Sequence, residues 1–179
     1  MDHFISLPLK NTDIKQLKAG DIVYLSGYIY TARDAAHKKL VEDFANNKAP
    51  IDIVDRTIYY VGPCPAPKNH LIGSSGPTTS ARMDNYTSQL LENGLKGMIG
   101  KGPRADYINK AIKEFEAIYF IACGGAGALL AKCITKVEEI AYQELGTESI
   151  KRLEIKNFPV IVATDSKGDS VFGVKKINR

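Results

Sequence analysis

Three cationic side chains stand where a predicted strand gives way to a small-residue turn or to the start of a helix. They are Arg33, Arg82 and Lys101. In open α/β sheets, ligands collect at the carboxyl ends of strands, and the first turn of a helix offers unpaired N–H groups and the positive end of its dipole. Guanidinium and ammonium groups add charge-assisted hydrogen bonds to carboxylates. The pattern predicts a site for a small anion.

The strongest candidate segment is GSSGPTTSARMD, residues 73–84. Glycines such as Gly76 let backbone amides approach a ligand, and Thr78, Thr79 and Ser80 add hydroxyl donors. We expect Arg82 one helical turn above Thr78 on the same face. Together these groups would form a carboxylate cradle, although an ordinary N-capped helix with a solvated arginine explains the residues equally well.

Two further segments could contribute to the same site. Arg33 and His37 are four residues apart, which predicts one helix face, and a guanidinium suits bidentate carboxylate binding. His37 could assist proton transfer or orient Arg33, whereas a single histidine on a helix is more often structural or solvated. Lys101 lies between Gly100 and Gly102, as in an anion-binding turn or an ordinary surface turn.

Nucleotide and metal sites have weaker support. The stretch CGGAGA, residues 123–128, is similar to a dinucleotide-binding turn, but the third glycine and a downstream acidic ribose partner are not clearly present. The three cysteines, Cys64, Cys123 and Cys133, form an odd set without a CxxC pair. This pattern argues against a disulfide framework and against a self-contained zinc or iron–sulfur site, so we predict no metal bound by this chain.

Composition indicates one folded domain over residues 1–179. The chain is 44% hydrophobic and 25% charged, which is typical of a globular protein. Its net charge of +4 is scattered, and no run interleaves aromatic residues with arginine, so nucleic acid is not an expected partner. No apolar segment reaches bilayer-spanning length and no leader pattern opens the chain. We therefore expect a cytoplasmic protein without a membrane partner.

Periodicity and turn residues predict alternating strands and helices, which is a mixed α/β fold. A proline-broken loop is expected at residues 62–70. The predicted strands are 3–9, 21–32, 57–62, 70–80, one within 95–103, 117–123, and a terminal hairpin of 157–168 with 169–177. The predicted helices are 33–47, beginning at Arg33 or Asp34, then 81–94, 105–117 and 124–134.

Four motifs in order, TARDAAHKK, GSSGPTTSARMD, IGKG and ACGGAGALLAK, extend over roughly residues 20–135. In this combination the chain resembles the beta subunit of class I, iron–sulfur-dependent fumarate hydratases. Tartrate dehydratase beta subunits and the C-terminal part of single-chain class I fumarases share the pattern. The resemblance implies a swivelling β/β/α domain, in which a mixed sheet or partial barrel packs against helices.

The same resemblance implies a hydro-lyase that reversibly hydrates fumarate to L-malate. It implies a [4Fe-4S] cluster held by an alpha subunit, with none bound by this chain alone. Thr78 resembles the proposed base, and Arg33, Arg82 and Lys101 resemble the substrate-binding cations. Thr79 and Gly76 lie beside them as further substrate contacts, and His37 and Asp34 are candidates for a supporting role.

A threonine hydroxyl is a poor base unless a carboxylate takes its proton, and we expect that carboxylate from the alpha subunit. The expected partners are therefore an alpha subunit in a hetero-oligomer and a small dicarboxylate. A homodimer of the isolated chain stays open. So do three other functions: tartrate dehydration, a non-catalytic anion-binding module, and a nucleotide-binding enzyme that uses Gly124 to Gly127.

Overall fold

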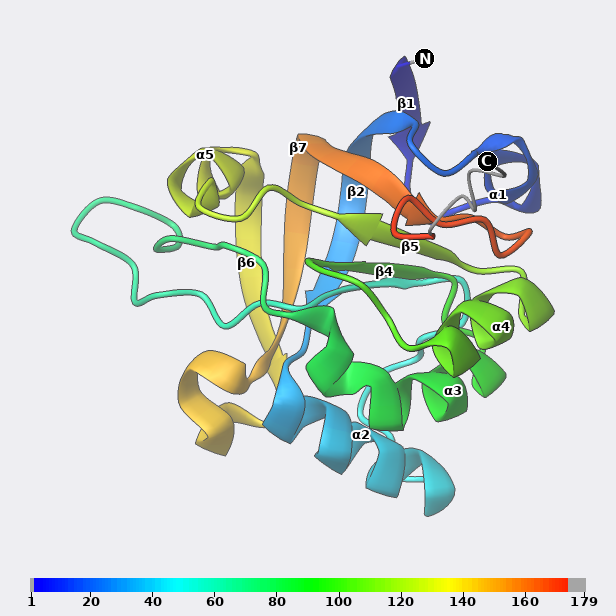
Figure 1. Cartoon of the computed structure of the whole chain (residues 1–179). Coiled ribbons are helices and arrows are strands. Elements are labelled where there is room, and N and C mark those ends of the chain that lie inside the picture. The colour runs from blue at the N-terminus through cyan, green and yellow to red at the C-terminus, as the bar shows by residue number, and fades with distance from the viewer. Residues whose placement is uncertain (1, 174–179) are drawn as a thin grey trace.

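Strand β2 (Ile22–Thr31) organises the sheet, because it pairs with three other strands. The computed structural model describes residues 2–173. β1 (Asp2–Ser6) and β3 (Thr57–Tyr59) lie parallel to β2, and the long β7 (Ile150–Thr164) lies antiparallel to it. These pairings bring the early strand β1 and the late strand β7 together around β2 (Figure 1).

The sheet closes on itself. β3, β4 (Gly97–Gly100) and β5 (Ile118–Ile121) pair in parallel, and β5 then pairs antiparallel with β7. Because β7 also pairs with β2, the strands β2, β3, β4, β5 and β7 form a five-stranded mixed barrel, with β1 and β6 (Ile134–Ala141) as additional strands. This architecture confirms the predicted mixed α/β fold with a barrel packed by helices.

Most of the helical residues lie on one side of the barrel (Figure 1). In Figure 1, α2 (Asp34–Ala45), α3 (Asp84–Glu92) and α4 (Asp106–Glu114) lie together, and the 3-10 helix η1 (Ser80–Met83) leads into α3. The short α1 (Asn11–Gln16) and α5 (Gly127–Lys132) lie at the opposite end in this view. A second 3-10 helix, η2 (Gln143–Glu148), joins β6 to β7. The four predicted helices are present, with α2 beginning at Asp34 and with α5 shorter than predicted because Ile134 already belongs to β6. The sequence did not predict α1 or η2.

Two buried clusters explain why the central strands read as continuous apolar runs. Tyr59 and Phe120 belong to one cluster, which contains side chains from β1, β2, β5 and β7. Their neighbours Tyr60 and Tyr119 belong to a second cluster, which contains side chains from helices α2, α3 and α4. Side chains alternate between the faces of a strand, so both faces of β3 and β5 are buried. Tyr60 and Tyr119 consequently lie on the helix-covered side.

The predicted strand over residues 70–80 is wrong. Only Thr79 makes a ladder-type contact, an isolated bridge to Lys101. The backbone groups before it are satisfied elsewhere: Gly73 N–H donates to Cys64 O, and Cys64 N–H donates to Ser74 O. Because these bonds hold the segment against its own loop, it has no continuous row of free groups with which to join the sheet.

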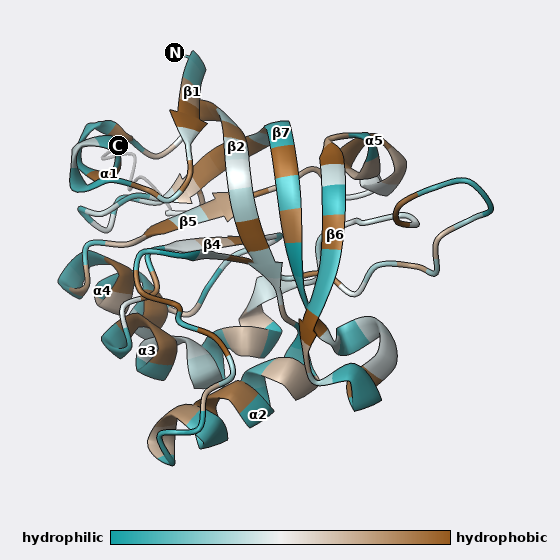
Figure 2. Cartoon of the chain, turned by 180° about the vertical axis from the view of Figure 1, so that it is seen from behind, coloured by the Kyte–Doolittle hydropathy of each residue, from teal (hydrophilic) through white to brown (hydrophobic). Residues whose placement is uncertain are grey.

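The predicted terminal hairpin of 157–168 with 169–177 forms only near its turn, where Asp165 N–H donates to Asp169 O and Val171 N–H donates to Ala163 O. β7 begins earlier than predicted, at Ile150, and its longer antiparallel partner is β6. Residues 169–173 meet β7 through an isolated bridge between Thr164 and Ser170, and residues 174–177 lie outside the described residues. Figure 2 shows the alternating hydrophilic and hydrophobic bands of β6 and β7.

Within residues 2–173, no helix is long and apolar enough to cross a membrane.

Candidate functional site

The parallel strands β2, β3, β4 and β5 end at one rim of the barrel. Arg33 follows β2, Gly62 follows β3 and Lys101 follows β4. The TTSAR segment, residues 78–82, crosses the same rim, because Thr78 N–H donates to Tyr60 O at 2.7 Å and Thr79 bridges to Lys101. Three predicted motifs therefore meet where ligands bind in α/β sheets.

The glycine-rich part of the cradle packs closely against the start of α5. Ser75 N–H donates to Gly127 O at 3.1 Å, and the Tyr59 hydroxyl donates to Ser75 O at 2.5 Å. A Cβ on Gly127 would lie 2.3 Å from Ser74 Oγ, so this position excludes a side chain. A Cβ added to Gly76 would lie 3.7 Å from the Cα of Gly127, so the two glycines are neighbours. The CGGAGA stretch thus supports the cradle.

Thr78 is not on a helix, so the predicted arrangement of Arg82 one turn above it is wrong. The 3-10 helix begins at Ser80 because the preceding residues are tied to strand ends: Thr78 to Tyr60, and Thr79 to Lys101. Thr78 is half-buried at the rim, and Thr79 is exposed beside it. Both hydroxyl-bearing residues still lie on the segment that carries Arg82.

One carboxylate links the two arginines. Arg82 Nε donates to Asp34 Oδ1 at 2.9 Å, and its Nη2 makes an ion-pair contact of 2.8 Å with Asp34 Oδ2. Arg33 Nε lies 3.9 Å from the same Oδ2 and 3.5 Å from Glu148 Oε1. Asp34 is the first residue of α2, where the helix dipole favours a negative charge. It therefore brings Arg33 and Arg82 together.

Close packing also fixes Arg33. A Cβ on Gly62 would lie 2.6 Å from Arg33 Nη1, so the absence of a side chain at Gly62 leaves space for the guanidinium. Lys101 is exposed, and a Cβ on Gly124 would lie 3.9 Å from its Cδ. The GKG turn and the CGG turn are therefore neighbours on the rim.

His37 supports the site from inside the protein. Arg33 is the N-cap of α2 with an extended backbone, so the two side chains do not share a helix face as predicted. His37 is fully buried; its Nδ1 lies 2.8 Å from Arg33 O, and its ring packs edge-on against Tyr60. Burial lowers the pKa of His37 to about 4, although the bond to Arg33 opposes the shift. A neutral ring that donates from Nδ1 holds the Arg33 backbone.

This burial predicts a pH dependence of stability. The unfolded chain, with the ordinary pKa of 6.5, takes up a proton at His37 before the folded chain does, so the free energy of unfolding falls as pH drops from 6.5 toward about 4. The expected loss is roughly 3 kcal/mol. Urea unfolding across this range should show a shallower pH dependence for His37→Asn than for the wild type. Identical slopes would exclude His37 as the titrating group.

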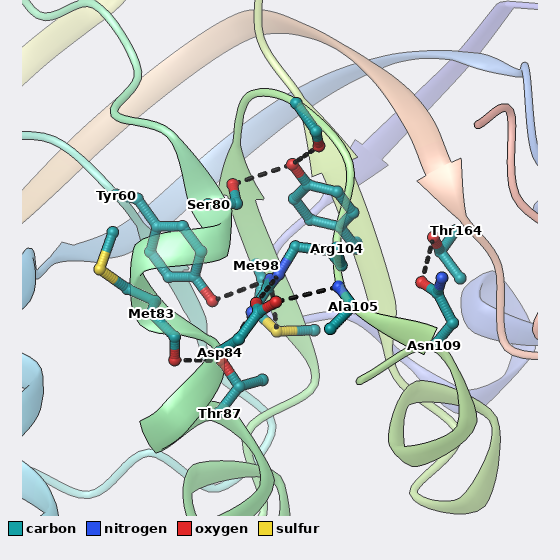
Figure 3. Close-up of polar contacts among 12 residues, drawn as sticks. Tyr60, Ser80, Met83, Asp84, Thr87, Met98, Arg104, Ala105, Asn109 and Thr164 are labelled. Atoms are coloured by element: carbon teal, nitrogen blue, oxygen red, sulfur yellow. Dashed lines mark hydrogen bonds and ion pairs between the residues drawn. The ribbon is translucent and has the colours of Figure 1, made fainter. Parts of the chain in front are cut away.

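A buried ion pair beneath the rim was not found from the sequence. Arg104 Nε lies 2.5 Å from Asp84 Oδ1, and its Nη2 donates to Thr87 Oγ1 at 2.6 Å (Figure 3). Its Nη1 also donates to the Tyr60 hydroxyl at 3.3 Å. Burial opposes the charged form, but Tyr60 and Asp84 outweigh it and the pKa of Arg104 rises. The pair holds the starts of α3 and α4 together.

The cysteines do not assemble a cluster site. Cys64 and Cys123 are exposed, and Cys133 is half-buried. Among residues 2–173, His, Cys, Asp and Glu side chains form no group of three that could hold a metal ion. The described part of this chain therefore does not fit an iron–sulfur cluster.

Fold and site together define a barrel domain whose strand ends carry Arg33, Arg82 and Lys101 at one rim. The family model described as "Fumarase C-terminus" matches residues 4–175. The chain therefore belongs to the fumarase C-terminus family of hydro-lyase subunits and domains.

Its relatives include both separate subunits and long single chains. The "Putative L(+)-tartrate dehydratase subunit beta" of Methanocaldococcus jannaschii is 40% identical, over 92% of this chain and 88% of that protein. The Escherichia coli L(+)-tartrate dehydratase subunit beta is 30% identical, over 98% of this chain and 89% of that protein. The aerobic class I fumarate hydratase of Escherichia coli is 36% identical over 94% of this chain, which spans only 32% of that enzyme.

Proposed function

We propose that this chain is the beta subunit of a hydro-lyase that reversibly hydrates fumarate to L-malate, with an active site shared with an alpha subunit. The observation that supports it most directly is the strand-end rim, where Arg33 and Arg82 share Asp34 and where the TTSAR segment meets Lys101. Family membership supports the reaction type.

The rim has the charge that a dicarboxylate requires. Fumarate and malate carry two carboxylates, and charge-assisted hydrogen bonds to two or more cations would hold both. Asp34 takes the Nε and Nη2 edge of Arg82, so Nη1 is left for a ligand. Thr79 and Gly76 add a hydroxyl and a backbone amide nearby. Asp34 and His37 act through Arg82 and Arg33 in this proposal.

Thr78 is the proposed base. Its hydroxyl needs a carboxylate that can accept its proton, and we propose that the alpha subunit supplies one. The alpha subunit would also hold the [4Fe-4S] cluster, which in such an enzyme serves as the Lewis acid for the departing hydroxyl. This chain's part is to bind and orient the dicarboxylate.

L-Tartrate is the second candidate substrate. The two tartrate dehydratase beta subunits match this chain over nearly their full length, as separate subunits would. Tartrate has one more hydroxyl than malate, so its site needs one more polar contact. A non-catalytic anion-binding module remains the candidate of another class, because the rim alone would bind an anion.

Fumarate hydration should appear only when this chain is mixed with its alpha subunit. We would assay fumarate hydration by this chain, by the candidate alpha subunit, and by both after anaerobic iron–sulfur reconstitution. Malate and both tartrate enantiomers would be assayed in parallel. A clear preference for tartrate would select the second substrate. A mixture that binds a cluster, turns over none of the four and still binds dicarboxylate would favour the module.

Loss of either arginine should weaken substrate capture. Arg33→Ala and Arg82→Ala are each expected to lower kcat/KM of the assembled enzyme roughly 10- to 100-fold, mainly through KM, because each removes a charge-assisted pair. Steady-state kinetics would measure the effect, and circular dichroism would check the fold. Arg152→Ala is the matched control, since it removes an arginine bonded to Glu138 on β6. Kinetics equal to that control would refute the two roles.

A further inference from the structure

Ser80 lies where the TTSAR segment crosses the GKG turn. Its N–H donates to Lys101 O at 2.9 Å, and Lys101 N–H donates to Ser80 Oγ at 3.1 Å. The side chain is fully buried, and a Cβ on Gly100 would lie 1.9 Å from Ser80 Oγ. The first glycine of the GKG turn is therefore required by the serine that packs against it.

Tyr119 extends this contact to the far side of the turn. Its hydroxyl oxygen lies 2.8 Å from Ser80 Oγ and 2.7 Å from Gly102 O. A carbonyl only accepts, so the single Tyr119 proton goes to Gly102 O, and the Ser80 proton then serves the bond between the hydroxyls. The result is a chain of three hydrogen bonds. Lys101 N–H donates to Ser80 Oγ, the Ser80 hydroxyl donates to the Tyr119 hydroxyl oxygen, and the Tyr119 hydroxyl donates to Gly102 O.

The tyrosine itself is held firmly. Tyr119 is fully buried, and the Arg104 guanidinium lies 5.0 Å from the centre of its ring. Burial raises the pKa of the Tyr119 phenol, so it keeps its proton at neutral pH. The buried Arg104–Asp84 pair thus fixes the ring whose hydroxyl reaches the turn.

We propose that Ser80 and Tyr119 are positioning residues: their linked hydroxyls fix the Lys101 turn against the TTSAR segment and so align Lys101 with Thr78 and Arg82. This inference rests on the proposed function of the rim. The two hydroxyls bond to each other and to the backbone at residues 101 and 102, so they act through Lys101 and not on the substrate.

The kinetic test compares Tyr119→Phe, Ser80→Ala and the double variant in the reconstituted complex. Each single change is expected to raise KM for the dicarboxylate about tenfold, with a smaller effect on kcat, because a buried hydroxyl partner is lost and Lys101 is misaligned. The double variant should lose little more than one single variant, since the hydroxyls work as one chain. The proposal would be overturned if the two single effects on KM multiplied in the double variant, or if the single variants left KM unchanged.

Tyr142→Phe is the matched control. Tyr142 is also a buried tyrosine of the helix-side cluster, and its hydroxyl donates to Asp43 Oδ2 at 2.6 Å near the end of α2. This change removes one tyrosine hydrogen bond without touching the GKG turn. Its KM should equal that of the wild type. A KM raised as much as in Tyr119→Phe would assign the effect to general destabilisation.

A readout without activity separates this inference from the proposed function. Amide hydrogen exchange at Lys101 in the full chain should be about tenfold faster in Ser80→Ala and Tyr119→Phe than in the wild type or Tyr142→Phe. If the wild-type complex hydrates neither fumarate nor tartrate, the proposed function fails, and the exchange rate alone decides the inference. Unchanged exchange at Lys101 would overturn the hydroxyl chain whatever the activity.

Discussion

Thr78→Ala is expected to lower the turnover number of the assembled enzyme by about 10²- to 10⁴-fold, the range that general acid–base catalysis supplies. The backbone should stay in place, because Thr78 is held through its N–H bond to Tyr60 O and not through its side chain. KM should therefore change much less than kcat. Steady-state kinetics of the reconstituted complex would measure both constants.

Thr78→Ser is the control for the lost hydroxyl. It keeps the oxygen and removes only a methyl group, so it should retain most of the turnover. Recovery in Thr78→Ser with loss in Thr78→Ala would support a hydroxyl that moves a proton. The opposite kinetic pattern, a raised KM with kcat intact in Thr78→Ala, would make Thr78 a binding residue only.

Arg104→Met is expected to lower the free energy of unfolding by about 3–5 kcal/mol, as for other buried ion pairs that lose one partner. Arg104 has a fully buried side chain, and that of Asp84 is 8% exposed. Without the guanidinium, the Asp84 carboxylate stays buried with the Ala105 N–H as its remaining hydrogen-bond donor. Urea unfolding at neutral pH would measure the loss.

The double variant Arg104→Met with Asp84→Leu tests the cause. Replacing both charges by apolar side chains removes the uncompensated carboxylate, so much of the lost stability should return. A double variant that is as unstable as Arg104→Met would assign the loss to packing or to the hydrogen bond with Thr87. Arg152→Ala, which removes an exposed ion pair with Glu138, should change the free energy of unfolding much less.

Local sequence patterns predicted the parts of the fold that depend on neighbouring residues. Alternation identified β2, and helical spacing identified α2 and α4, because burial of one face dictates those periods. The pattern failed at residues 70–80, where apolar and small residues resemble a strand but bond to their own loop. It also missed β6, whose run of Lys136, Glu138 and Glu139 looks like a solvated segment until it pairs with β7.

The predicted site residues share one rim because residues after parallel strands must meet at the same edge. Motif reading therefore found Arg33, Arg82 and Lys101, whose roles stay predictions. It could not find Glu148 near Arg33, or Asp84 beside Arg104, because those contacts join segments far apart in the chain. It also misplaced Thr78 on a helix, since no local signal reveals its bond to Tyr60.

The closing strand β7 has a consequence for how the chain folds. The barrel closes only when β7 pairs with β2 on one side and β5 on the other, although β2 lies near the opposite end of the sequence. Contacts of such high sequence separation form slowly, because loop closure costs entropy before the contacts repay it. During synthesis, the segments that carry both arginines and the lysine therefore leave the ribosome before the strand that closes their scaffold, and the rim reaches its final geometry among the last parts of the molecule.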